Sequence, residues 1–155
     1  MKIAVITVSF NSERCIGKTI DSVNRQTYQN VEHIFIDGAS QDKTVEIIYE
    51  TCDRRNVLVS EPDKGVYDAM NKGLTRATGD IICFLNSDDF FVDYNILEEV
   101  ALEFSNARVN YIWGNILFVD RTNTDKVKRY WKSKFCVFGL EIRSKIVWLI
   151  GFFLE

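Results

Sequence analysis

Histidine is nearly absent from this sequence, and its cysteines do not cluster. His33 is the only histidine, and the four cysteines (Cys15, Cys52, Cys83 and Cys136) are far apart and form no C-x-x-C pair. A zinc site draws its ligands from such clusters, so we expect none here. Cys83 lies within an apolar run, which is typical of a small core residue. Unclustered thiols of this kind indicate a reduced, cytoplasmic protein.

Long apolar runs and an excess of basic charge are also missing. The longest uninterrupted apolar run, IVWLIGFFL, is too short for a transmembrane helix, and the segment MKIAVITVSFNSE has neither the h-region nor the cleavage site of a signal peptide. The 155 residues carry 19 basic and 22 acidic side chains, a net charge of −3, which gives no reason to expect a nucleic-acid partner. Neither G-x-x-x-x-G-K-[ST] nor G-x-G-x-x-G occurs, which argues against a P-loop ATPase and an NAD-binding domain.

What the sequence does have is a regular alternation of apolar runs and helical stripes. The apolar runs predict four strands, over residues 3–8, 31–37, 57–60 and 80–85, and apolar residues at helical spacing follow each of them. This order predicts a single α/β domain with a mainly parallel sheet flanked by helices. Residues 111–120 and 126–131, separated by RTNT, predict a β-hairpin attached to that sheet.

Polar residues gather where each predicted strand ends, in the segments SFN, DGAS, SEPDKG and NSDD. Ligands of parallel α/β sheets bind beyond the carboxyl ends of the strands, although loops are polar in general and acids often cap helices. Asp88 and Asp89 come shortly after a buried strand, where their charges repel each other unless a divalent cation compensates them. Oxygen ligands suit Mg²⁺ or Mn²⁺, which complete their shell with phosphate and water. The pair therefore indicates a phosphate-bearing ligand, with Lys64 as a second positive charge.

An ordered set of motifs resembles a known family. VSFN, IDGAS-D-T, EPDKG-YDAMNKG, A-GD and LNSDD occur in this order, from about residue 1 to about residue 130. The set resembles the family 2 glycosyltransferases, which have the GT-A (Rossmann-like) fold. The resemblance implies a nucleotide-sugar-binding domain over residues 1–130. It also implies transfer of a sugar from a nucleotide-diphosphate donor, usually with inversion, to a polysaccharide or a lipid-linked glycan.

The resemblance further implies roles for individual residues. Asp37 would accept a hydrogen bond from the nucleotide base, Asp88 would hold the ribose, and Asp89 would bind the Mn²⁺ or Mg²⁺ that bridges the diphosphate. The remaining implied donor contacts are Val8, Phe10 and Asn11 around the nucleotide, Lys64 and Gly65 near the phosphates, and Asp68 and Asn71 in the wall of the pocket. A carboxylate at Asp37 would suit the imide N–H of uracil or thymine. UDP- or dTDP-sugars are therefore mildly preferred, and GDP-sugars are left open.

The acceptor half does not follow the family pattern. Residues 131–155 form an apolar tail unlike the family's acceptor segment, and we expect a truncated acceptor region there. No general base is assigned, because Asp120 and Asp125 are interpreted as solvated turn carboxylates and Glu141 has no supporting motif. Asn115 also stands where many relatives have Asp. The alternative function is a truncated, non-catalytic remnant that binds nucleotide or acts as an interaction module.

The sequence does not decide what the apolar tail contacts. Its residues would pack on the sheet as core or form a homodimer. If they were exposed instead, with Arg143 and Lys145 next to Trp148, they would suit contact with the inner face of the membrane.

Overall fold

A computed structural model describes residues 1–51, 56–106, 111–120, 123–132 and 145–148. Its centre is a six-stranded sheet in the order β3-β2-β1-β4-β8-β5, in which every pairing is parallel. The strands are β1 (Ile3–Ser9), β2 (Val31–Asp37), β3 (Asn56–Ser60), β4 (Ile81–Phe84), β5 (Tyr111–Trp113) and β8 (Lys145–Trp148). The α/β class is confirmed, and the four predicted strands appear as β1 to β4 with nearly the same ends.

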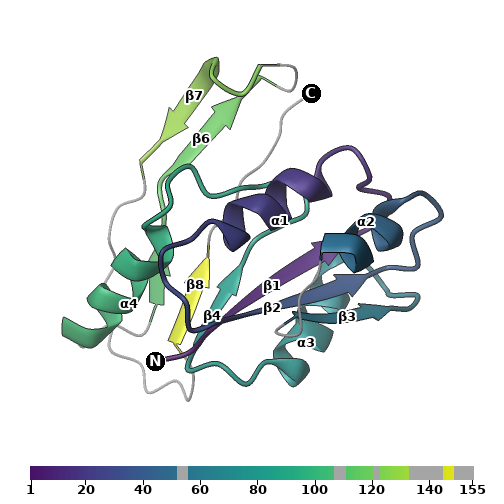
Figure 1. The fold of residues 1–155 in the computed structure, drawn as a ribbon, viewed down its shortest axis with the longest axis horizontal. Coiled ribbons are helices and arrows are strands. Elements are labelled where there is room, and N and C mark those ends of the chain that lie inside the picture. Colours follow the sequence, from purple (N-terminus) through teal and green to yellow (C-terminus); the bar gives the residue numbers. More distant parts are fainter. Residues whose placement is uncertain (52–55, 107–110, 121–122, 133–144, 149–155) are drawn as a thin grey trace.

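The described helices cover both faces of this sheet (Figure 1). They are α1 (Ile16–Asn24), α2 (Thr44–Thr51), α3 (Val66–Arg76) and α4 (Ile96–Asn106). Alternate side chains of β1 point to opposite faces of the sheet. Ile3 and Val5 belong to a buried cluster that includes residues of α1 and α4, and Ile6 belongs to a cluster that includes a residue of α3. All seven residues of β1 are buried. The continuous β-branched run in the sequence therefore reflects a strand covered on both sides.

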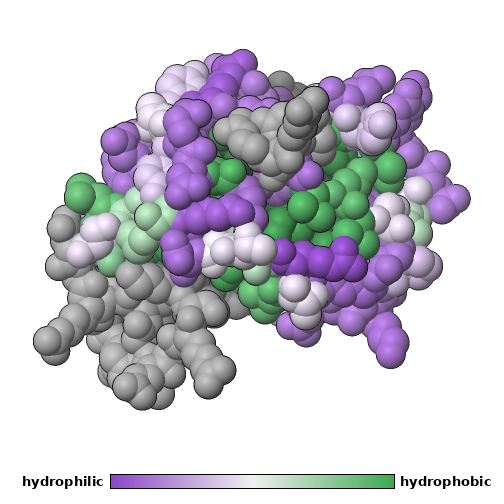
Figure 2. Space-filling view, turned by 60° about the horizontal axis from the view of Figure 1, so that its bottom comes forward, coloured by the Kyte–Doolittle hydropathy of each residue, from purple (hydrophilic) through white to green (hydrophobic). Residues whose placement is uncertain are grey.

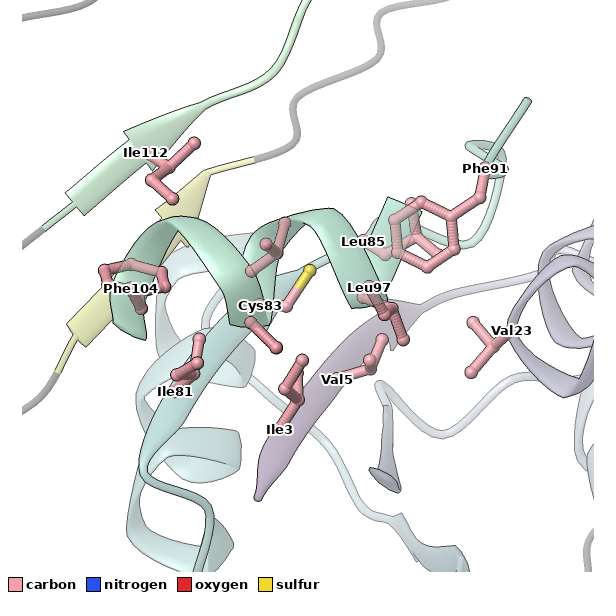
Figure 3. Close-up of a cluster of buried hydrophobic side chains, with 12 residues drawn as sticks. Ile3, Val5, Val23, Ile81, Cys83, Leu85, Phe91, Leu97, Phe104 and Ile112 are labelled. Carbon is pink, nitrogen blue, oxygen red and sulfur yellow. The ribbon is translucent and has the colours of Figure 1, made fainter. Parts of the chain in front are cut away.

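The cluster between the sheet and α4 forms the larger core (Figure 3). Leu97 and Phe104 of α4 are 0% and 2% exposed and pack against Ile81 and Cys83 of β4. Burial raises the pKa of the Cys83 thiol to about 12. Cys83 is thus an unreactive core residue, as its place in an apolar run predicted.

The opposite face of the sheet is covered by α3. A Cβ at Gly73 would overlap the side chain of Ile6, so this glycine lets α3 lie close to β1. Figure 2, in which the lower side of Figure 1 comes forward, shows hydrophobic residues gathered in one area with hydrophilic residues around them. Exposed apolar residues of β3 and α3 include Val57, Val66 and Leu74.

A buried acid holds the edge of the sheet where β1 and β2 begin. The Glu32 carboxylate accepts hydrogen bonds from the backbone N–H groups of Thr78 (2.6 Å) and Gly79 (2.9 Å) and pairs with Lys2. Burial alone would raise the pKa of Glu32, but the hydrogen bonds from Lys2 and Thr78 outweigh it and lower that pKa. These contacts of Glu32 therefore stabilise the fold at the end of the sheet where β1 and β2 begin.

The β-hairpin comprises β6 (Ile116–Val119) and β7 (Val127–Trp131), which pair antiparallel. Residues 111–113, predicted as its first segment, instead form β5 in the main sheet, parallel to β8. Ile112 is 8% exposed and belongs to the large core cluster, which explains why this segment joins the sheet.

Part of the apolar tail also belongs to the main sheet. Residues 145–148 form β8 between β4 and β5, with Ile81 opposite Lys145 and Phe84 opposite Trp148. Residues 133–144 and 149–155, including Glu141 and Arg143, lie outside the described residues. The boundary at residue 130 stays a prediction. Among the helices that the structure describes, none is long and apolar enough to span a bilayer.

Candidate functional site

The loops that follow β1 and β2 are joined by reciprocal hydrogen bonds. The backbone N–H of Asn11 donates to Ser40 Oγ at 2.8 Å, and the backbone N–H of Gln41 donates to Asn11 Oδ1 at 2.9 Å. Asn11 and Ala39 have φ values of 49° and 63°, in the left-handed region. Asn11, which is predicted to contact the donor, thus connects the two loops through these hydrogen bonds.

Asp42 extends this link between the two loops. Its carboxylate accepts hydrogen bonds from the backbone N–H groups of Glu13 (3.0 Å) and Thr44 (2.9 Å), the first residue of α2. Burial opposes ionisation, but hydrogen bonds from Thr44 and Glu13 lower the pKa of Asp42 below its usual value. The loops after β1 and β2 therefore form one connected unit.

Asp37, at the end of β2, is 0% exposed and joins three strand ends. Its carboxylate accepts hydrogen bonds from Ser9 Oγ (3.0 Å), the backbone N–H of Ser40 (2.9 Å) and Ser60 Oγ (2.7 Å). The Ser40 hydroxyl donates to it as well. Both carboxylate oxygens are engaged with the protein. The contact to a nucleotide base stays a prediction, and it would require one of these donors to give way.

The loop before α3 approaches the loop after β2. A Cβ at Gly38 would lie 2.6 Å from Asp63 Oδ2, so the glycine makes room for this carboxylate. Gly65 has φ 109°, a conformation that favours glycine, and its N–H donates to Asp63 Oδ1 at 2.7 Å. Asp68, in the first turn of α3, accepts a hydrogen bond from the N–H of Lys64 at 3.1 Å.

The other predicted donor contacts differ in exposure. Phe10, Lys64 and Asn71 are exposed, and Phe10 retains 62% of its accessible surface. Val8 is 8% exposed and packs in the α3-side core, so its side chain presents little surface to a ligand.

The carboxylate pair follows β4. Asp89 is 7% exposed, and Asp88 is half-buried. Asn86 Nδ2 donates to Asp89 Oδ2 at 3.2 Å, and the Asp89 N–H donates to the Asn86 carbonyl at 3.1 Å. Ser87 Oγ lies 2.8 Å from Ser12 Oγ in the loop after β1, which brings the pair next to the first-strand loop.

These residues fit a cation of one chemical class. No group of three or more His, Cys, Asp or Glu side chains that could hold a metal ion gathers in the part of the chain that the structure describes. Mg²⁺ and Mn²⁺ need only one or two protein carboxylates when phosphate and water supply the rest. Asp88 and Asp89 supply that number of carboxylates, and the metal contact of Asp89 stays a prediction.

Sequence reasoning missed the serines around Asp37 and the polar residues of α1. Ser9 and Ser60 each end a strand, and Thr19 is a 1% exposed polar residue inside an amphipathic helix. A polar residue amid the buried face of α1 was the available signal for Thr19. Nothing in the local sequence pairs Ser9 or Ser60 with Asp37, because those contacts depend on strand order.

The parallel sheet with helices on both faces is an α/β fold of the GT-A type, which it shares with solved glycosyltransferase structures. The sequence profile described as glycosyl transferase family 2 matches residues 4–152, and the chain belongs to that family.

Curated relatives support this assignment. The chain is 38% identical over 114 residues to an uncharacterized glycosyltransferase of Mycobacterium tuberculosis, covering 72% of this chain and 44% of the relative. It is 31% identical over 122 residues to the UDP-Glc:alpha-D-GlcNAc-diphosphoundecaprenol beta-1,3-glucosyltransferase WfgD of Escherichia coli, covering 78% of this chain and 48% of the relative. The chain thus spans about half the length of the curated relatives it matches.

Solved structures share the fold at lower identity. The mannosyltransferase PcManGT from Pyrobaculum calidifontis, in complex with GDP-Man and Mn²⁺, has a TM-score of 0.65 and 23% identity, over 76% of this chain and 35% of that chain. Residues 1–349 of TarS from S. aureus, in complex with UDP-GlcNAc, have a TM-score of 0.64 and 22% identity, over 77% of this chain and 34% of that chain.

Proposed function

We propose that this chain carries the donor-binding half of a glycosyltransferase. It would bind a nucleotide-diphosphate sugar beyond the carboxyl ends of β1 to β4 and transfer the sugar, with inversion, to a polysaccharide or a lipid-linked glycan. The observation that carries the proposal is the adjacent pair Asp88 and Asp89 on a loop hydrogen-bonded to the first-strand loop. Family membership supports the same chemistry.

The carboxylate pair would hold Mn²⁺ or Mg²⁺ together with the donor diphosphate. Such a cation stabilises the negative charge that develops on the departing nucleoside diphosphate. Asn86 orients Asp89 through its side-chain hydrogen bond. Lys64, exposed in the middle of the DKG turn, would add positive charge near the phosphates.

Two similar proteins are described with different nucleotides, so the identity of the donor nucleotide is left open in this proposal. WfgD takes UDP-Glc by its name, and PcManGT is in complex with GDP-Man. The mild preference for uracil or thymine rested on a free acceptor at Asp37, whose oxygens are engaged by serines. UDP, dTDP and GDP are therefore all tested.

A second candidate function is nucleotide binding without turnover. Within the described residues, the two acids weighed as general bases serve the hairpin turn. Asp120 accepts a hydrogen bond from the N–H of Asn123 at 3.3 Å and pairs with Lys128 at 3.1 Å, and the Asp125 N–H donates to Asn123 Oδ1. This position favours the interpretation as turn carboxylates and leaves the base unassigned.

Calorimetric titration tests the donor site. UDP, dTDP and GDP are added to the folded chain with and without Mn²⁺, and the same is done for Asp89→Asn. The matched control is Asp93→Asn, which removes the same charge from an exposed acid in the same loop. We expect one nucleotide to bind only with Mn²⁺, loss of binding in Asp89→Asn, and unchanged binding in Asp93→Asn.

Two results separate the candidate functions. If the folded wild-type chain binds none of the three nucleotides with Mn²⁺, the donor-site proposal fails. If binding occurs, release of nucleoside diphosphate from the matching nucleotide sugar, measured with a glycan or lipid-linked acceptor, distinguishes transfer from binding alone.

A further inference from the structure

The loop that carries the carboxylate pair is anchored to α1. Residues 85–95, between β4 and α4, contain neither helix nor strand. Thr19 Oγ1 donates a hydrogen bond to the Ser87 carbonyl at 2.8 Å, and the Phe91 N–H donates to Ser22 Oγ at 3.1 Å. These two contacts lie on either side of Asp88 and Asp89 in the chain.

A third side chain extends the anchor toward α4. Gln26, just after α1, is 3% exposed. Its Nε2 donates to the Asp93 carbonyl at 2.7 Å, and its Oε1 accepts from the Leu97 N–H at 3.0 Å. The same amide also donates to the Ser22 carbonyl at 3.1 Å. Gln26 therefore connects the end of α1, the loop and the start of α4.

Thr19, Ser22 and Gln26 are spaced by three and four residues, the spacing of neighbours on one helix face. Thr19 is 1% exposed and lies among the buried apolar residues Ile16, Ile20 and Val23 of α1. A buried hydroxyl needs a hydrogen-bond partner, and Thr19 finds its partner in the loop backbone. The face of α1 thus combines core packing with recognition of this loop.

An anchor of this kind matters most at a pair of adjacent carboxylates. Asp88 and Asp89 repel each other, and the loop has no regular secondary structure to hold them against that repulsion. Ligating carboxylates depend on outer partners that fix their orientation, and the loss of such a partner typically lowers metal affinity by about 10- to 100-fold.

We propose that Thr19, supported by Ser22 and Gln26, is a positioning residue that sets the Ser87–Asp89 backbone for cation and donor binding. This inference rests on the proposed function, since it specifies how that same site is held. Thr19 acts through the Ser87 carbonyl and does not itself contact the donor.

The test compares two buried threonines. Thr19→Val removes the hydroxyl that reaches the loop. Thr7→Val removes an equally buried hydroxyl, which lies 2.8 Å from His33 Nε2 of β2 instead of bonding to the loop backbone. Thr19→Ser keeps the hydroxyl and serves as the conservative rescue. Ser22→Ala, a smaller change, provides a second probe if Thr19→Val does not fold.

Two quantities are measured for each variant. Amide hydrogen exchange over residues 87–93 reports how firmly the loop is held, with no ligand needed. Calorimetry with Mn²⁺ and whichever of UDP, dTDP or GDP the wild type binds reports the site. We expect faster exchange over residues 87–93 and about tenfold or greater loss of Mn²⁺-dependent affinity in Thr19→Val, and the same direction in Ser22→Ala. Thr7→Val and Thr19→Ser should resemble the wild type in both.

The outcomes separate this inference from the proposed function. If exchange and affinity change equally in Thr19→Val and Thr7→Val, the effect is general destabilisation and the positioning role is refuted. Unchanged exchange and affinity in Thr19→Val refute it as well. If the folded wild type binds no nucleotide, the proposed function fails by itself, and the exchange contrast still decides whether α1 anchors the loop.

Discussion

Replacement of Asp37 by asparagine should weaken the fold at the point where three strands end. The substitution keeps the shape and one oxygen, which can still accept the Ser40 N–H. The other oxygen becomes an NH₂ group that faces the hydroxyls of Ser9 and Ser40. Both hydroxyls can rotate and accept hydrogen bonds from the new NH₂ group. Asp37→Asn therefore keeps hydrogen bonds at this position, but it loses the extra strength that the negative charge gave them.

The magnitude follows from the contacts. Hydrogen bonds to a charged group contribute about 1.5–3 kcal/mol each, and rotated hydroxyls recover part of this in Asp37→Asn. We expect the free energy of unfolding to fall by about 2 kcal/mol. For a chain of this size, that loss lowers Tm by about 4–8 °C.

Urea unfolding followed by circular dichroism measures the effect. The matched control is Asp21→Asn, which removes the same charge from an exposed helical acid paired with Arg25 at 2.9 Å. We expect the control to change the free energy of unfolding by less than about 0.5 kcal/mol. If Asp37→Asn retains wild-type stability and instead changes which nucleotide binds, the carboxylate reads the base and the structural role is wrong.

Two further predictions concern stability away from the carboxylate pair. Burial lowers the pKa of His33 from 6.5 to about 3, so below pH 6.5 the unfolded chain takes up a proton that the folded chain does not. The free energy of unfolding should therefore fall by about 2 kcal/mol between pH 7 and pH 5, and urea titrations of His33→Asn should show a smaller fall; an equal fall would assign the effect to other groups. Gly65→Ala should cost about 1–3 kcal/mol because φ is 109°, whereas Gly17→Ala, with open space around its added Cβ, should stabilise α1 by up to about 1 kcal/mol. Thermal unfolding of both glycine variants checks this contrast, and similar Tm changes would contradict it.

The sequence predicted the central strands because their apolar runs are long and bounded by polar breaks. β1 and β2 are each seven residues long, and nearly every residue is buried. Residues 111–113 are too few to show a period, and Gly114 follows them directly, so they were joined to the hairpin. Their place beside β8 depends on a segment more than 30 residues further along the chain, which local patterns do not encode.

The candidate site shows the same division. That polar residues gather at four strand ends followed from sequence alone, because parallel strands end at one edge of the sheet. The hydrogen-bond partners of each acid could not be predicted from the sequence. Asp37 meets Ser9 and Ser60 only because β1 and β3 flank β2, and the anchor from Thr19 to Ser87 spans 68 residues of sequence.

The acids at this edge differ in their surroundings, and that difference supports separate proposed roles for them. Asp37 is fully buried, and protein hydroxyl and amide donors occupy both of its oxygens. Asp88 and Asp89 are adjacent in the chain, so each carries its neighbour's charge as a cost that a bound cation would remove. An acid held by serines from three strand ends stabilises the platform, whereas an adjacent pair on an anchored loop is suited to hold an ion. The proposed roles therefore differ: a structural one for Asp37, the last residue of β2, and a cation-binding one for Asp88 and Asp89 in the loop after β4.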